Sequence, residues 1–236
     1  MIVSANQPYF TPFPGFFYKA HLSDVLVLLD EVQFPRGTTW ITRNRFKNDQ
    51  GTLWMTIPVK KKGLGLQNMN AVRIYHEGHW ARKHLASLRN AYANAPYFAD
   101  HINFIKTLFS KQFEKLIDLN LEIIRYLIEC LNIDTKVVLL SELGIKARGD
   151  QLLIDICRVL GASCYLAQRP AQKYLNPDLF RDAQIELKYF KLPALIYPQL
   201  WGSFIPNLSA LDLVFNCGPK AHEIITSVHQ QINLST

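Results

Sequence analysis

The run Val25-Leu26-Val27-Leu28-Leu29 decides the fold, because it is apolar throughout, has the length of a strand and carries an acid at each end, Asp24 and Asp30. A strand that is covered on both faces is apolar at every position, whereas a half-exposed strand alternates. The run is therefore typical of a buried strand in a parallel sheet. A strand at Ile2–Ala5, a loop rich in proline and glycine, and a helix at Phe16–Leu22 are expected before it, which completes a βαβ unit.

Strands and helices continue to alternate in the second half of the chain. Further parallel strands are expected at Val137–Leu140, Cys164–Ala167 and Ile185–Phe190, and Gly161 is expected to end the helix that precedes the second of them. In open α/β sheets of this kind, ligands bind at the carboxyl ends of the strands.

Two additions interrupt the parallel pattern. Antiparallel strands are expected at Trp40–Lys47, Leu53–Val59 and Val72–Tyr75, with turn residues at 48–51 between the first two. A helical insertion follows at about residues 76–132, where apolar residues recur every three or four positions. The sequence thus predicts one α/β domain over residues 1–236, with a Rossmann-like open, mostly parallel sheet, an antiparallel extension and a helical insertion.

Composition limits the class of protein. Half of the 236 residues are apolar, which is enough for a sizeable core, and four cysteines are too few for a disulfide scaffold. No apolar run approaches the roughly 18 to 20 residues that cross a bilayer, and the first residues lack the pattern of a signal peptide. We expect a cytoplasmic protein without membrane insertion.

The net charge of +7 is concentrated in one segment. Residues 36–62 contain seven cations and one acid. Such a segment favours anionic partners, such as phosphates, nucleotides, acyl carriers or nucleic acid, although a solvated basic loop has the same composition.

Polar residues follow the first two predicted parallel strands. Gln7 and Tyr9 come after the first strand, and Asp30 and Gln33 come after the second. Carboxyl ends of neighbouring parallel strands meet at one edge, so we expect these side chains to line a ligand site. Asp30 is the candidate general base, with the capping of a turn as its alternative.

The basic segment contributes the other candidate substrate-binding residues. They are Trp40, Arg43, Asn44, Arg45 and Lys47. Arginine can hold a phosphate or carboxylate through two hydrogen bonds while an indole covers an adjoining ring. The alternative is an edge strand in which these residues simply alternate between the two faces, because it has the same sequence pattern.

Other patterns indicate structure rather than chemistry. Ser209 and Asp212 have the spacing of a capping box at a helix start. His76, His79 and His84 lack the spacing and the acid of a metal site, and no metal is predicted. The diagnostic nucleotide, hydrolase and zinc motifs are absent from the sequence.

The polar motifs also carry a family resemblance over almost the whole chain. The residues concerned are Gln7-Pro8-Tyr9 with Pro12 and Gly15, Ser23-Asp24, the segment 29–34, Trp40 with residues 43–45, the segment 54–59, Tyr165-Leu166, Tyr174-Leu175, Tyr197-Pro198-Gln199 and the segment 208–213. With these motifs the chain resembles the WbqC-like protein family. It departs from the pattern at residues 167–171, where a more glycine-rich loop is expected.

The resemblance implies a bacterial protein of surface-polysaccharide (O-antigen) biosynthesis. Our leading hypothesis is a transferase that moves an acyl or aminoacyl group onto a nucleotide-linked amino sugar, with a small anionic substrate as its partner and an unspecified cofactor requirement. The alternative is a non-catalytic protein that binds nucleic acid or another polyanion through the basic face of residues 36–62.

Overall fold

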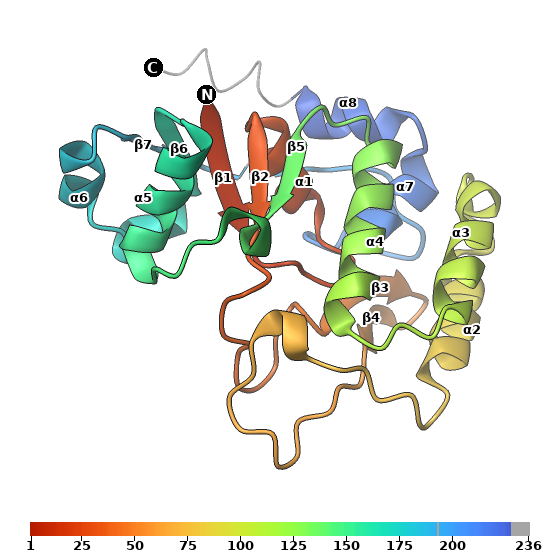
Figure 1. The fold of residues 1–236 in the computed structure, drawn as a ribbon. Helices are drawn as coiled ribbons and strands as arrows, with labels where there is room; N and C mark the ends of the chain where they lie inside the picture. The colour runs from red at the N-terminus through yellow and green to blue at the C-terminus, as the bar shows by residue number, and fades with distance from the viewer. Residues whose placement is uncertain (193, 228–236) are drawn as a thin grey trace.

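A five-stranded parallel sheet forms the centre of the computed structural model, which describes residues 1–192 and 194–227 (Figure 1). Its strands are β1 (Ile2–Asn6), β2 (Val25–Leu28), β5 (Lys136–Leu139), β6 (Cys164–Gln168) and β7 (Glu186–Phe190). They lie in the order β5-β2-β1-β6-β7, and each neighbouring pair is parallel. This arrangement confirms the predicted mostly parallel α/β sheet.

Helices cover both faces of the sheet. One face packs on α1 (Pro14–His21), α4 (Leu116–Cys130), α7 (Ala210–Cys217) and α8 (Lys220–Thr226), and the other on α5 (Gly149–Leu160) and α6 (Pro177–Asp182). Alternate residues of β2 accordingly belong to different hydrophobic clusters: Leu26 and Leu28 pack toward the first group, Val25 and Val27 toward the second. Burial on both faces explains why β2 is apolar at every position.

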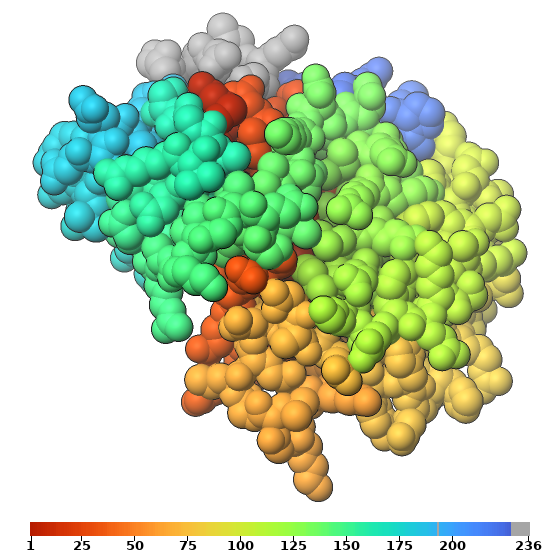
Figure 2. All heavy atoms as spheres, in the orientation of Figure 1, coloured from red at the N-terminus to blue at the C-terminus, as the bar shows by residue number. Residues whose placement is uncertain are grey.

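A separate antiparallel hairpin, β3 (Arg43–Asn48) and β4 (Gly51–Thr56), lies on the side of the strands' carboxyl ends (Figure 1). Its turn falls at residues 49–50 as expected, but its first strand is shorter than expected. Residues 40–42 form a turn instead, in which the Thr42 amide donates to the Thr39 carbonyl at 3.2 Å. The loops after β4 (orange) form the lower edge of the molecule in Figure 2.

The strand expected at Val72–Tyr75 is wrong. This segment forms only isolated bridges, from Ile74 to Val59 and from Arg73 to Lys115. Its alternation reflects burial, because Val72 and Ile74 are buried while the residues beside them are exposed. An extended segment with alternating burial thus has the sequence pattern of a strand, although it forms no continuous ladder of backbone hydrogen bonds.

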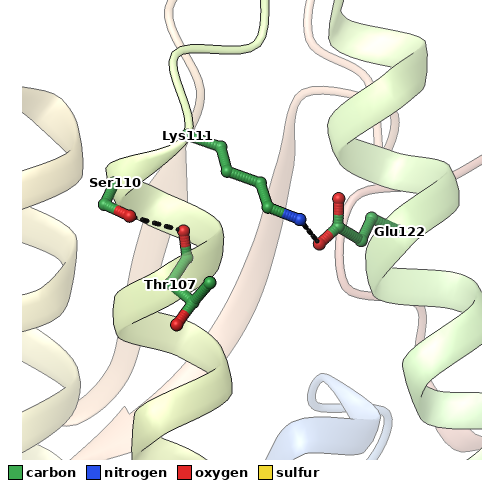
Figure 3. A network of polar contacts seen from close by, with 4 residues as sticks. All are labelled: Thr107, Ser110, Lys111 and Glu122. Atoms are coloured by element: carbon green, nitrogen blue, oxygen red, sulfur yellow. Dashed lines mark hydrogen bonds and ion pairs between the residues drawn. The ribbon is translucent and has the colours of Figure 1, made fainter.

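The helical insertion is confirmed as α2 (Trp80–Tyr92), α3 (Phe98–Ser110) and α4. Beyond the end of α3, Lys111 reaches across to α4, where its Nζ lies 2.6 Å from Glu122 Oε1 (Figure 3). In the same view, the Ser110 hydroxyl donates to the Thr107 carbonyl at 2.7 Å and closes the last turn of α3.

Three short 3₁₀ helices complete the described part of the chain, η1 (Met69–Ala71), η2 (Leu140–Leu143) and η3 (Arg169–Lys173). The last two begin directly after β5 and β6, so they lie at the carboxyl edge of the sheet. Gly161 ends α5 with φ of +68°, as the sequence predicts. Among the helices of residues 1–192 and 194–227, none is long and apolar enough to span a membrane.

Candidate functional site

The order of the strands reverses direction between β1 and β6. The sheet runs from β1 toward β2 and β5 on one side, and toward β6 and β7 on the other. The β1–β6 ladder ends at Val3 and Tyr165, whereas β1 stays paired with β2 up to Asn6, and β6 stays paired with β7 up to Gln168. The carboxyl ends of β1 and β6 are therefore unpaired with each other, at the switch point where ligands bind in such sheets.

Two buried asparagines hold the loop that leaves β1. Asn120 on α4, fully buried, donates to the carbonyls of Pro8 at 2.8 Å and Ile41 at 2.9 Å. Asn44 on β3 donates to the carbonyls of Phe10 at 3.0 Å and Thr11 at 2.7 Å. These bonds tie the loop between β1 and α1 to α4 and to the hairpin.

The hydrogen-bonding groups of the Asn44 side chain therefore bind backbone groups. Its amide nitrogen donates to two carbonyls, its side-chain oxygen accepts from the Arg45 amide at 2.8 Å, and it is 1% exposed. These contacts give Asn44 a role in holding the loop, and direct contact with substrate remains a prediction.

Gln7 and Tyr9 lie on this fixed loop and are half-buried. The Tyr9 ring packs 6.2 Å from the Phe16 ring, and burial raises the pKa of its phenol. The neighbouring Phe10 amide donates to the Trp40 carbonyl at 2.9 Å. This bond joins the loop that carries Tyr9 to the segment that carries Trp40.

Asp30 lies at the carboxyl end of β2 and is 4% exposed. One of its oxygens accepts from the Ser141 amide at 3.0 Å, and the other from the Ser141 hydroxyl at 2.6 Å. The carboxylate thus ties the end of β2 to η2, which follows β5. Gln33 lies further out on an exposed loop, where it bridges to Asn68.

Four residues of the hairpin region, Trp40, Arg43, Arg45 and Trp54, form what we call the tryptophan–arginine platform. Arg43 and Arg45 lie on one face of β3, because alternate residues of a strand share a face. The Arg43 guanidinium carbon is 3.6 Å from the centre of the Trp54 ring, and that of Arg45 is 5.8 Å from Trp40. The two indoles lie 5.7 Å apart and are 43% and 44% exposed.

The arginines of the platform have hydrogen-bond donors that no protein group accepts in the described part of the chain. Arg45 donates from Nη2 to the carbonyls of Pro206 at 3.0 Å and Asn207 at 3.1 Å. The Nε atoms of Arg43 and Arg45 are both buried and have no hydrogen-bond partner in the described part of the chain. Buried donors without partners are rare in proteins, and an absent ligand or ion is one explanation.

Lys47, which the sequence assigns to substrate binding, forms its hydrogen bonds within the protein. Its side chain is 2% exposed, and its Nζ donates to the Ser203 carbonyl at 2.8 Å and to Gln199 Oε1 at 3.2 Å. Burial lowers the pKa of Lys47, although Asp212 acts in the opposite direction. Lys47 thus anchors the loop of residues 199–207 on β3, and its contact with substrate is still only a prediction.

Asp212 and Tyr92 complete a buried network that the sequence does not reveal. The Ser209 side chain caps α7 by accepting from the Leu211 amide at 3.2 Å, as predicted. The predicted capping box is nevertheless wrong, because the Asp212 carboxylate accepts from the Tyr92 hydroxyl at 2.6 Å and the Ser209 amide donates to the Arg45 carbonyl at 2.8 Å. Burial raises the pKa of Asp212. An acid within the apolar run 210–215 is the only sequence signal for this network.

A second buried cation lies under the carboxyl end of β1. Lys19 on α1 is 5% exposed, and its Nζ donates to the Ala5 carbonyl at 2.8 Å and to Asn6 Oδ1 at 3.2 Å. No carboxylate of the described residues pairs with it, and burial lowers its pKa to about 7. The sequence signal is a lysine in the middle of the otherwise apolar run 16–20 of α1.

A cavity with a volume of about 670 Å³ lies beside the carboxyl end of β7. It is lined by Pro14, Tyr189, Phe190, Lys191, Leu192, Ala194, Leu195, Tyr197, Phe204, Pro206 and Asn207. A second hollow of about 540 Å³ adjoins it at Lys191 and Leu192 and reaches the end of β6. Neither cavity was predicted, although Tyr197 in the wall of the first belongs to the family motif Tyr197-Pro198-Gln199.

The histidines and cysteines make ordinary structural contacts. His76 and His84 lie 2.9 Å from the carbonyls of Phe113 and Thr56, respectively. Cys157 and Cys164 are buried, and burial raises the pKa of both thiols. Within residues 1–192 and 194–227, no three histidine, cysteine, aspartate or glutamate side chains are grouped as they would be around a metal ion.

Comparison with known proteins gives two matches. The model of the WbqC-like protein family matches residues 7–224. The uncharacterized protein Rv1507c of Mycobacterium tuberculosis (strain ATCC 25618 / H37Rv) is 28% identical over 230 residues, which is 97% of this chain and 99% of the relative. No solved structure matches the chain.

Proposed function

Because the chain belongs to the WbqC-like protein family, we propose that it is a transferase of bacterial surface-polysaccharide (O-antigen) biosynthesis that moves an acyl or aminoacyl group onto a nucleotide-linked amino sugar. The relative from M. tuberculosis is uncharacterized, so the proposal depends on the site itself.

The tryptophan–arginine platform is the observation that carries the proposal. Exposed indoles offer faces on which a nucleobase can stack, and the unpartnered Nε donors of Arg43 and Arg45 lie beside them. A nucleotide-linked sugar has the matching parts, which are a planar base and an adjoining diphosphate. Its sugar would then extend toward Tyr9 and Gln7 on the fixed loop.

The transfer itself requires one bond to form and one to break. The amine nitrogen of the sugar attacks the acyl carbonyl carbon, a C–N bond forms, and the carrier leaves with the electron pair of its bond to that carbon. The amine gives up a proton, for which Asp30 is the proposed base. A carboxylate has about four acceptor sites, and Ser141 uses two of those on Asp30. Gln7 is proposed to orient the carbonyl.

Calorimetric titration of a UDP-linked amino sugar tests the proposal. We expect saturable binding to the wild type and about 10-fold to 100-fold weaker binding to Arg43→Gln, because a charge-assisted hydrogen bond contributes about 1.5–3 kcal/mol. Arg125→Gln, an exposed arginine of α4, is the matched control and should bind normally. Equal affinities of the two variants for the UDP-linked amino sugar would show that the platform does not bind it.

The same exposed indoles favour a second candidate, a non-catalytic protein that binds single-stranded nucleic acid through the basic face of residues 36–62. It differs in its response to salt, because affinity for nucleic acid falls steeply with salt as counterions are released. Binding of an oligonucleotide with a steep salt dependence, together with no binding of the sugar nucleotide, would replace the first proposal by the second.

A further inference from the structure

The cavity beside β7 is apolar on most of its wall. Phe190, Leu192, Leu195 and Phe204 contribute the apolar surface. Its volume of about 670 Å³ lies within the usual range of about 300–1,000 Å³ for small-molecule sites. Phe204 is 38% exposed, so its ring is available to an apolar ligand.

The adjoining hollow has the opposite character. Its lining includes Arg169, Lys173 and Lys191, and it contains no acid. All three cations are exposed, and none forms an ion pair within the described part of the chain. Three unpaired cations in one hollow attract a multiply charged anion more strongly than a single phosphodiester.

The two spaces adjoin each other, because Lys191 and Leu192 belong to both linings. A ligand that fills both must be apolar at one end and carry several negative charges at the other. Their position also suits the reaction: η3 begins directly after β6, the strand next to β1, and Pro14 of the cavity wall follows the loop that carries Gln7.

We propose that the cavity and its basic hollow bind the acyl donor as a coenzyme A thioester, with the acyl chain against the apolar wall and the phosphates at Arg169, Lys173 and Lys191. The assignment rests on the proposed function, which requires an acyl donor. Coenzyme A has both a diphosphate and a 3′-phosphate, which match a cluster of three cations.

The wall of the cavity is tied to the other half of the site. Arg45 of the platform donates to the carbonyls of Pro206 and Asn207, both of which line the cavity. Lys47 holds Ser203 on the same loop. The donor and acceptor sites therefore share one structural element, strand β3.

Calorimetric titrations of octanoyl-CoA and free coenzyme A separate the two parts of the donor site. The double variant Arg169→Gln/Lys191→Gln should weaken both ligands by about tenfold or more. Ala194→Trp fills the cavity from an exposed position and should weaken octanoyl-CoA but leave coenzyme A unchanged. Ala99→Trp, at an exposed alanine of α3, is the matched control and should affect neither.

The results distinguish the donor site from the function on which it rests. Octanoyl-CoA binding that is absent, or that is unchanged by both variants, would overturn the donor site. If the UDP-linked amino sugar still binds in that case, the proposed function stands with another donor. If octanoyl-CoA binds with the expected losses but the sugar nucleotide does not bind, the donor site stands and the proposed function falls.

Discussion

Replacing Asn120 with alanine should destabilise the protein and loosen the loops around the proposed site together. Asn120 lies on α4, is fully buried and donates to the carbonyls of Pro8 and Ile41. Pro8 precedes Tyr9, and Ile41 follows Trp40, so one amide group holds both loops on which predicted ligand residues lie.

The cost follows from the two carbonyls that would lose their donor. A buried polar group without a partner costs about 1–3 kcal/mol, so two of them cost about 2–6 kcal/mol. The Asn120 side-chain oxygen is itself buried without a partner, and its removal returns part of that cost. We therefore expect the free energy of unfolding to fall by about 2–5 kcal/mol.

Urea unfolding followed by circular dichroism measures this loss. Asn103→Ala is the matched control, because Asn103 lies on α3, is exposed and accepts a long hydrogen bond from Lys106 at 3.4 Å. A loss for Asn120→Ala below about 1 kcal/mol, or no larger than that of the control, would show that the two hydrogen bonds do not hold the loops.

Three further predictions concern buried groups and close packing. Burial lowers the pKa of Lys19 from 10.5 to about 7, so between these pH values the unfolded chain binds a proton that the folded chain lacks. The unfolding free energy of the wild type, relative to that of Lys19→Met, should therefore rise by up to about 5 kcal/mol as the pH increases across this window. A difference in urea unfolding that does not change with pH would contradict this. Burial raises the pKa of Asp212 above 3.8, so the wild type should lose stability relative to Asp212→Asn as the pH rises through that higher pKa. The two proteins would be unfolded in urea between about pH 4 and pH 8, and an increase in the relative stability of the wild type would refute the reasoning. A Cβ on Gly15 would lie 2.5 Å from the Phe13 ring and 2.6 Å from the Leu192 side chain, so Gly15→Ala should lower the free energy of unfolding by about 1–3 kcal/mol. Thermal unfolding measures this loss, and an unchanged melting temperature would show that the Leu192 side chain moves aside freely.

The sheet could be predicted because its signals are local. The apolar run of β2 is buried at every position, Gly161 ends α5, and the turn at 49–50 joins β3 to β4. Each of these features depends on residues that are close in sequence. Alternation alone misled at Val72–Tyr75, because burial of an extended segment gives the same pattern as a paired strand.

The contacts within the candidate site could not be predicted in this way. Asn44 is bound to carbonyls more than 30 residues away, and Tyr92 reaches Asp212 across 120 residues. An asparagine beside arginines has the same sequence whether it binds a substrate or a backbone carbonyl. The pattern around Ser209 likewise indicated a capping box, because nothing near Asp212 in sequence indicates its buried partner.

The central claim is group transfer to a nucleotide-linked amino sugar, and product analysis tests it most directly. The protein would be incubated with a UDP-linked amino sugar and octanoyl-CoA, followed by mass spectrometry of the sugar nucleotide and measurement of released thiol. The account predicts that an acyl group is added to the sugar nucleotide with one thiol released for each, and that Arg43→Gln slows both while Arg125→Gln does not. A protein that binds neither compound and forms no acylated sugar nucleotide would contradict it.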